Sequence, residues 1–265
     1  MIDLHLHTSR CGHASGGVDE YVEAARASGL TTICFTDHLP LPDGYPDCYS
    51  MTWPQFPDYV REVRAAAQAS LAAGGPEVLC GVEADWLPES APLIAGAAAA
   101  HDLDLVLGSV HFVEGWAFDD PDEIDRYEEW DIESLWERYF EQVAAAAASR
   151  LFDVIAHPDL VKKFGFRPEV DPSPWYEETA SVLAATGVAV EVNTAGLRKP
   201  VREVYPSLAL LQACRRRGVP ATTGSDAHSH EDVGAGLDRA RELLLQAGYG
   251  SVLVFRKRVP TEVPL

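Results

Sequence analysis

The sequence predicts an α/β fold built around parallel β-strands. Short apolar segments recur along the chain, and segments with helix-forming patterns lie between them. Several apolar segments lack the polar–apolar alternation of a half-exposed strand, which is typical of strands covered on both faces. Alternating strand and helix units form either an open parallel sheet or a closed barrel. The 265 residues suffice for one large domain, such as an α/β barrel, or for two small ones.

Seven segments are candidates for the strands of this sheet. Each is a short run of apolar or β-branched residues, the composition that strands favour. In chain order they are Ile2–Leu6, Thr32–Thr36, Val78–Val82, Leu105–Val110, Val154–Ala156, Val188–Val192 and Ala221–Thr223. A further segment, Ser251–Phe255, is expected either to close the sheet or to flank it.

Helix signals lie between the strands. Val18 and Val22 share one helical face, and Gly29 is expected to end that helix. Ser207 is a candidate cap for a helix over Leu208–Arg217, whose C-terminal arginines suit the negative end of the helix dipole. Longer helices are predicted over Asp131–Arg150 and Glu231–Ala247, and the proline-rich segment Leu39–Pro57 is predicted to be a loop.

The composition argues against several classes of protein. The chain carries 41 acidic residues against 21 Lys and Arg, a formal net charge of −20 that repels nucleic acids and anionic membranes. The five cysteines are scattered without a CxxC pair, which argues against a disulfide scaffold or a cysteine zinc finger. No basic segment precedes the first apolar run, and the Ala-rich runs are too short to span a bilayer. A cytoplasmic protein is therefore expected.

Polar side chains stand at the ends of the predicted strands. Because the C-terminal ends of parallel strands meet on one face of a barrel, we expect these side chains to converge. His5 and His7 are two residues apart, so strand alternation points both imidazoles to the same side. The full series is His5 and His7, Asp37 and His38, Glu83, His111, His157, Asn193, and Asp226 with His228.

Histidines dominate this series. Seven of the nine in the chain lie at or just after strand ends: His5, His7, His13, His38, His111, His157 and His228. A single histidine is more often a hydrogen-bonded structural residue, as we expect for His101, but seven at one rim favour metal binding. Imidazoles together with the carboxylates of Glu83 and Asp226 suit Zn, Fe or Mn. One catalytic zinc uses about three protein ligands, so two or three ions are predicted, and paired ions commonly hydrolyse phosphate esters.

The motifs around these residues resemble those of the PHP (polymerase and histidinol phosphatase) family of metal-dependent phosphoesterases. The likeness extends over nearly the whole chain, and its pieces occur in the family's order. They are His5-Leu6-His7-Thr8 with His13, Asp37-His38, Glu83, His111, His157 and Asp226-Ala227-His228. The segments Gly81–Trp86, Gly108–Phe112 and Ala156–Leu160 look like those of the histidinol-phosphate phosphatase branch.

The resemblance implies a fold, a reaction and a set of metal ligands. The fold would be a single domain over residues 1–265, a distorted TIM-like (β/α)7 barrel with the metal site at the C-terminal strand ends. The reaction would be the hydrolysis of L-histidinol phosphate to L-histidinol and phosphate in histidine biosynthesis. Three divalent ions, Zn, Fe or Mn, would be bound. The first would be held by His5, His7, Glu83 and Asp226, and the second by Glu83, His111 and His157. The third would be held by His13, His38 and His228.

Other residues are expected to contact the substrate. Arg198 follows the sixth strand, and a guanidinium binds phosphate through two parallel hydrogen bonds. Lys162 and Lys163 follow the fifth strand and offer further positive charge, and Asn193 and His230 are additional candidates for substrate contact. The leaving oxygen needs a proton or a metal ion, and the residues that could assist it are Asp37, Asp226 and His230.

Other functions remain compatible with this sequence. The same site could hydrolyse another small phosphomonoester, such as a nucleotide or sugar phosphate, or a C–N bond as in amidohydrolase barrels. A non-catalytic, metal-binding barrel would bind ions without turning over any phosphomonoester. The complete set of predicted ligands argues against a decayed, inactive relative. The oligomeric state is left open by the sequence.

Overall fold

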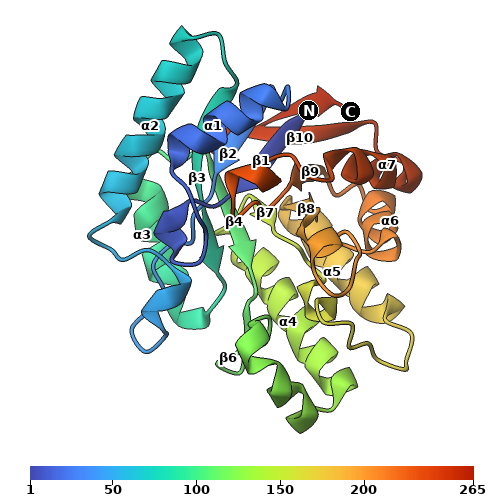
Figure 1. The fold of residues 1–265 in the computed structure, drawn as a ribbon. Coiled ribbons are helices and arrows are strands. Elements are labelled where there is room, and N and C mark those ends of the chain that lie inside the picture. The colour runs from blue at the N-terminus through green and yellow to red at the C-terminus, as the bar shows by residue number, and fades with distance from the viewer.

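Seven parallel strands form a nearly closed barrel in this computed structural model, as the resemblance predicts. The structure describes the backbone of residues 1–265 and every side chain except that of Asp47. The strands follow one another around the barrel in chain order (Figure 1). They are β1 (Ile2–Leu6), β2 (Thr32–Phe35), β3 (Glu77–Asp85), β4 (Leu105–Ser109), β7 (Val154–Ile155), β8 (Ala189–Asn193) and β9 (Ala221–Gly224).

The barrel closes where the first strand meets the last. The Asp226 amide donates to the His5 carbonyl at 2.9 Å, and the His7 amide donates to the Ala227 carbonyl at 3.0 Å. Leu6 and Ala227 form a parallel bridge at the same place. The closing bonds therefore lie beside four residues of the predicted metal site, at the C-terminal ends of both strands.

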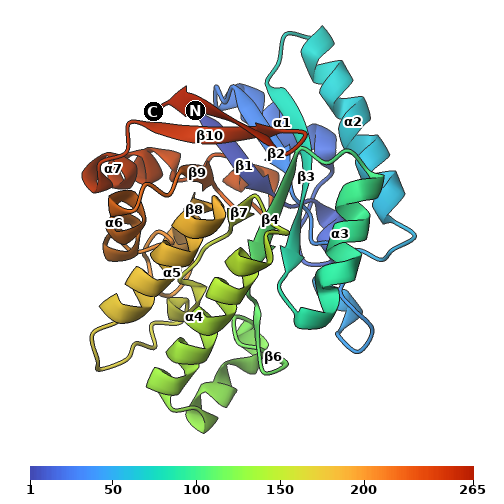
Figure 2. The same ribbon diagram turned by 180° about the vertical axis from the view of Figure 1, so that it is seen from behind.

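Helices surround the outside of the barrel and strand side chains fill its interior, so most strand residues are buried on both faces. Helices α1, α2 and α3 cover one side, and α4, α5, α6 and α7 cover the other (Figures 1 and 2). The helices are α1 (Val18–Ala27), α2 (Phe56–Ala72), α3 (Ala91–Ala100), α4 (Ile132–Ser149), α5 (Ser173–Thr186), α6 (Leu208–Arg216) and α7 (Leu237–Ala247). Within the described part of the chain, no helix combines the length and apolar character needed to cross a bilayer.

Helix ends follow the local sequence, with two corrections to the predictions. The Ser207 side chain accepts from the Leu210 amide and caps α6 as predicted. The helix predicted over Glu231–Ala247 is wrong in its first part, because Gly234 and Gly236 have positive φ angles and α7 begins only at Leu237. The proline-rich loop is also shorter than predicted, because Pro57 lies in the first turn of α2, where its missing amide costs nothing.

Two small antiparallel sheets lie outside the barrel. The predicted last strand is β10 (Ser251–Arg256), which pairs with β11 (Val259–Pro264) and flanks β9. The Thr222 hydroxyl donates to the Leu253 carbonyl and joins this hairpin to the barrel. The second hairpin, β5 (Phe112–Val113) with β6 (Trp116–Ala117), follows β4 and stands over the C-terminal end of the barrel. The two chain termini lie beside each other near β10 in both views (Figures 1 and 2).

Gly108 in β4 is expected to be intolerant of any side chain. A Cβ atom built there would overlap the ring of Phe152, which is buried in the core. Overpacking of this kind typically costs about 1–3 kcal/mol. We therefore expect Gly108→Ala to lower the free energy of unfolding by that amount, which is measured as a lower urea midpoint at an unchanged m-value.

Gly96 provides the matched control, because it lies in α3 with no atom within 4 Å of a built Cβ. Gly96→Ala should raise the midpoint, since alanine stabilises a helix interior by about 0.5–1 kcal/mol relative to glycine. An unchanged midpoint for Gly108→Ala would show that the Phe152 ring can move aside at no cost.

Candidate metal centre

The carboxylate of Glu83 lies at the centre of a histidine cluster. Glu83 is 1% exposed, in the part of β3 that extends toward the C-terminal end of the barrel. One oxygen, Oε2, lies 3.1 Å from His5 Nε2, 3.2 Å from His7 Nε2 and 3.4 Å from His38 Nδ1. The other oxygen, Oε1, lies 2.9 Å from His157 Nε2 and 3.6 Å from His111 Nε2. Five imidazoles from four strand ends therefore converge on one acidic side chain.

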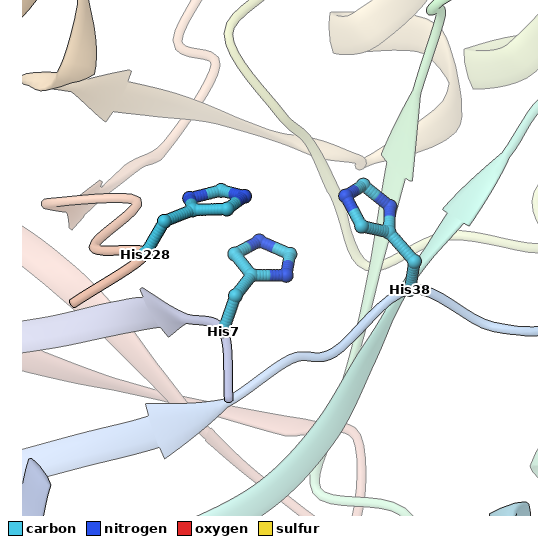
Figure 3. A group of neighbouring side chains, drawn as sticks. All are labelled: His7, His38 and His228. Carbon is cyan, nitrogen blue, oxygen red and sulfur yellow. The ribbon is translucent and has the colours of Figure 1, made fainter. Parts of the chain in front are cut away.

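The remaining predicted ligands adjoin this carboxylate. The Nε2 atoms of His5 and His7 are 2.9 Å apart, and Asp226 Oδ1 lies within 3.8 Å of both. The Nε2 atoms of His13 and His228 are 3.0 Å apart. Figure 3 shows His7, His38 and His228 side by side, each following a different strand, with the His7 ring stacked 4.4 Å from that of His228. The structure thus brings all nine predicted metal ligands into one continuous cluster.

Two buried carboxylates orient the histidines from behind, and the sequence reasoning missed both. Glu191 Oε1 lies 2.7 Å from His5 Nδ1, and Glu191 Oε2 accepts from the His157 amide at 3.0 Å. Asp85 Oδ1 lies 2.8 Å from His111 Nδ1. Each feature had a sequence signal: Glu191 interrupts an apolar strand, and Asp85 follows Glu83 by two residues on the same strand.

This donor set fits divalent metal ions. Donation from His5 Nδ1 to Glu191 leaves a lone pair on Nε2 of the neutral ring. That lone pair faces a nitrogen of His7 at 2.9 Å and an oxygen of Glu83 at 3.1 Å. Lone pairs this close repel one another unless a proton or a cation lies between them. Because Zn–N bonds are about 2.0–2.1 Å long, two nitrogens about 3 Å apart can share one ion.

The charges in the cluster depend on one another. Burial opposes ionisation of Glu83, but the imidazoles of His38 and His5 hold the pKa of its carboxyl well below the usual range. Burial also opposes protonation of His5, but Glu191 and Asp226 raise the pKa of its imidazole well above the usual range. Burial and the neighbouring His7 lower the pKa of His228 to about 3. Ionised Glu83 and neutral His228 are in the forms that bind metal, whereas a metal ion must displace the proton that the neighbouring carboxylates favour on His5.

The backbone is strained at two of the predicted metal ligands, which follow the ends of β7 and β9. His157 and Asp226 have φ angles of 29° and 53°, values that residues other than glycine adopt at a cost of about 1–3 kcal/mol. Gly224 allows a close approach nearby, because a Cβ there would overlap Glu191 and lie 2.5 Å from His5 Cβ. The strand ends are therefore shaped to bring these side chains together at the expense of local stability.

The cluster opens into a cavity of about 490 Å³. Two lysines, Lys163 and Lys199, line it together with seven of the nine predicted metal ligands, all except His5 and His7. Lys163 Nζ lies 2.9 Å from the carboxylate of Asp119, which also lines the cavity. Phe112 and Tyr49 add aromatic surface, with ring centroids 5.9 Å apart. The cavity thus combines cationic, acidic and aromatic groups within reach of the histidines.

Three other predicted site residues are engaged in contacts within the protein. The Asp37 carboxylate is buried and accepts hydrogen bonds from the Thr8 amide and hydroxyl. Lys162 is fully buried, with Nζ 2.8 Å from an Asp159 oxygen. The Arg198 guanidinium donates to the carbonyls of Ser225 and Asp226 and so braces the loop that carries two predicted ligands.

The last two predicted site residues differ in their distance from the cluster. Asn193 lies within it, and its amide donates to Glu191 at 3.0 Å and to Asp226 at 3.2 Å. His230 lies farther along the same loop as Asp226, partly exposed at the start of a short 3-10 helix, His230–Asp232. Lys199, which lines the cavity and directly follows Arg198, was not predicted from the sequence as a site residue.

Comparisons with known proteins place these features in a family. The family model described as PHP domain matches residues 3–195, and the model described as PHP-associated matches residues 210–237. The chain is 42% identical over 259 residues to the probable histidinol-phosphatase of Deinococcus radiodurans, covering 97% of each protein. It is 26% identical over 260 residues to the histidinol-phosphatase of Bacillus subtilis, covering 88% of this chain and 95% of that protein.

The fold has a close counterpart among solved structures. The histidinol phosphate phosphatase of Lactococcus lactis, in complex with zinc, L-histidinol and phosphate, superposes with a TM-score of 0.80 at 20% identity. That likeness covers 98% of each chain and shows the same barrel. A family model that matches most of the chain, together with a relative 42% identical over nearly its full length, shows that this chain belongs to the PHP domain family.

Proposed function

We propose that this protein is a histidinol-phosphate phosphatase, which hydrolyses L-histidinol phosphate to L-histidinol and phosphate. The observation that carries the proposal is the convergence of nine predicted metal ligands in one cluster, seven of which line a cavity that also offers cationic, acidic and aromatic groups. The 42% identity to a probable histidinol-phosphatase supports the choice of substrate. A small zwitterionic phosphate matches the mixed charge of the cavity better than a polyanion does.

We propose three divalent ions, drawn from Zn, Fe and Mn, held by the ligand sets that the family resemblance implies. Bound ions would supply Lewis acidity, offsetting negative charge on the phosphoryl group and activating water at neutral pH. The residues of the chain fix the arrangement, because Glu191 and Asp85 hold the rings of His5 and His111 in one orientation. Glu83 lies between two groups of imidazoles and would be shared by two of the ions.

The lysines of the cavity are proposed to contact the phosphate. Lys163 and Lys199 line the wall and can donate to phosphoryl oxygens. The aromatic surface of Phe112 and the carboxylates of Asp119 and Asp120 suit the imidazole and ammonium end of L-histidinol. Two sets of roles stay predictions. One is substrate contact by Arg198, Lys162, Asn193 and His230, and the other is assistance to the leaving oxygen by Asp37 or Asp226.

We further propose that residues 1–265 act as a single domain in the cytoplasm. The four buried cysteines are free thiols, which suits a reducing compartment. The net charge of −20 makes nucleic acids and anionic membranes unfavourable partners. The partner expected at the site is therefore a small phosphomonoester.

The substrate is tested by measuring kcat/KM for L-histidinol phosphate alongside a nucleoside monophosphate and a sugar phosphate. The expected result is the highest value for L-histidinol phosphate, because the cavity pairs cationic groups with an acidic and aromatic surface. A higher value for either other compound would favour a different small-molecule phosphatase. Bound metal without turnover of any phosphomonoester would favour the non-catalytic barrel.

Metal removal is expected to abolish the activity. Dialysis against a chelator should leave the carboxylates and imidazoles in place without the cation that they face, and adding Zn, Mn or Fe should restore turnover. Metal analysis of the restored protein should give three ions per chain. Full activity in metal-free protein would contradict the proposed metal-dependent chemistry. A measured content of one metal ion per chain would contradict the assignment of three ligand sets.

Glu191→Gln should weaken metal binding about 10- to 100-fold, the usual effect of losing a carboxylate behind a metal-bound histidine. The substitution removes the charge that orients the His5 ring. The measurement is competition for metal against a chelator of known affinity. Glu177→Gln is the matched control, because Glu177 pairs with two surface arginines. If both variants bound metal like the wild type, Glu191 would have no role in the site.

A further inference from the structure

Tyr205 lies in the wall of the cavity, beside the predicted metal ligands. Its side chain is 1% exposed, and its backbone pairs with that of Asn193 in both directions, at 2.9 and 2.6 Å. The ring packs against Gly196, where a Cβ would come within 2.9 Å of the ring carbons. The His157 ring lies 6.5 Å away between centroids. The tyrosine is thus held firmly beside a predicted metal ligand.

The hydroxyl of Tyr205 makes no hydrogen bond with any residue that the structure describes. Leaving a buried hydroxyl unsatisfied costs about 1–3 kcal/mol. Burial and the nearby carboxylate of Asp159 raise the pKa of this phenol well above its usual range, so the oxygen keeps its proton. The cavity wall therefore contains a fixed hydrogen-bond donor without an acceptor, although a phenylalanine would fill the same space at lower cost.

We propose that the Tyr205 hydroxyl donates a hydrogen bond to a phosphoryl oxygen of the bound substrate. The inference rests on the proposed function, since it assumes that a phosphate occupies this cavity. Tyr205 lines the cavity with His157, Asp226, Lys163 and Lys199, the groups expected to surround the phosphate. Phosphoryl oxygens have lone pairs that accept a hydrogen bond from the hydroxyl, whereas the ammonium group of L-histidinol has no lone pair. The missing acceptor is then supplied by the substrate.

Tyr205→Phe tests this inference because it removes only the hydroxyl and keeps the ring on Gly196. The expected result is a 10- to 100-fold fall in kcat/KM for L-histidinol phosphate, as for the loss of one donor to a transition state. The inhibition constant of inorganic phosphate should rise severalfold, and that of L-histidinol should stay unchanged. Metal content should also be unchanged, and the urea midpoint of unfolding should be equal or higher.

Tyr127→Phe is the matched control. The Tyr127 hydroxyl is also buried and without a partner among the described residues, but it lies in the aromatic packing around Trp116 and Phe166. Its loss should leave kcat/KM and the phosphate inhibition constant at wild-type values. The two variants should therefore have similar stability and differ only in their handling of phosphate.

Two outcomes would overturn the inference. One is a Tyr205→Phe variant with wild-type kcat/KM and wild-type phosphate inhibition. The other is weaker binding of L-histidinol with unchanged binding of phosphate, which would put the hydroxyl at the other end of the substrate. Calorimetric binding of inorganic phosphate to the metal-loaded proteins tests the contact independently of substrate identity. If the wild type does not hydrolyse L-histidinol phosphate, the proposed function fails, while this measurement still decides the role of Tyr205.

Discussion

The burial of the Glu83 carboxylate at the C-terminal end of the barrel is the constraint on which the rest of the site depends. A charge that is 1% exposed is very unfavourable unless partners surround it. Here five imidazoles surround it, and they come from the ends of four different strands, since His5 and His7 both lie at the end of β1. Only a barrel that is nearly closed brings those ends together. The arrangement of the strands and the chemistry of the site therefore support each other.

Much of the fold could be predicted, because its signals are local. Apolar runs revealed all seven barrel strands, and Ser207 revealed the start of α6 through its cap. Errors arose where backbone conformation overrides pattern. The start of α7 was misjudged because the positive φ angles of Gly234 and Gly236 are imposed by the loop. The two-residue strands β5 and β6 are too short to leave a periodic signal.

The sequence predicted the candidate metal ligands better than the residues that surround them. The nine candidate ligands are recognisable because histidine and carboxylate recur at strand ends, and the structure brings them together. Glu191 and Asp85 were missed because their function appears only when distant strands are adjacent; Glu191 contacts a residue 186 positions away. The positive charges of Arg198 and Lys162 suggested phosphate binding, which stays a prediction. In the structure they contact carbonyl groups and Asp159, and nothing in the sequence indicated these contacts.

The seam between β1 and β9 has a consequence for the order of assembly. His5 and His7 are among the first residues synthesised, yet Asp226 and His228, which complete their surroundings, come more than 200 residues later. At about 5–20 residues per second, roughly 10–45 s of synthesis separate them. Until then His5 and His7 lack Asp226, and the barrel lacks the hydrogen bonds that join β1 to the segment after β9. The ligand set that includes Asp226 is therefore completed only when the last strand of the barrel is in place.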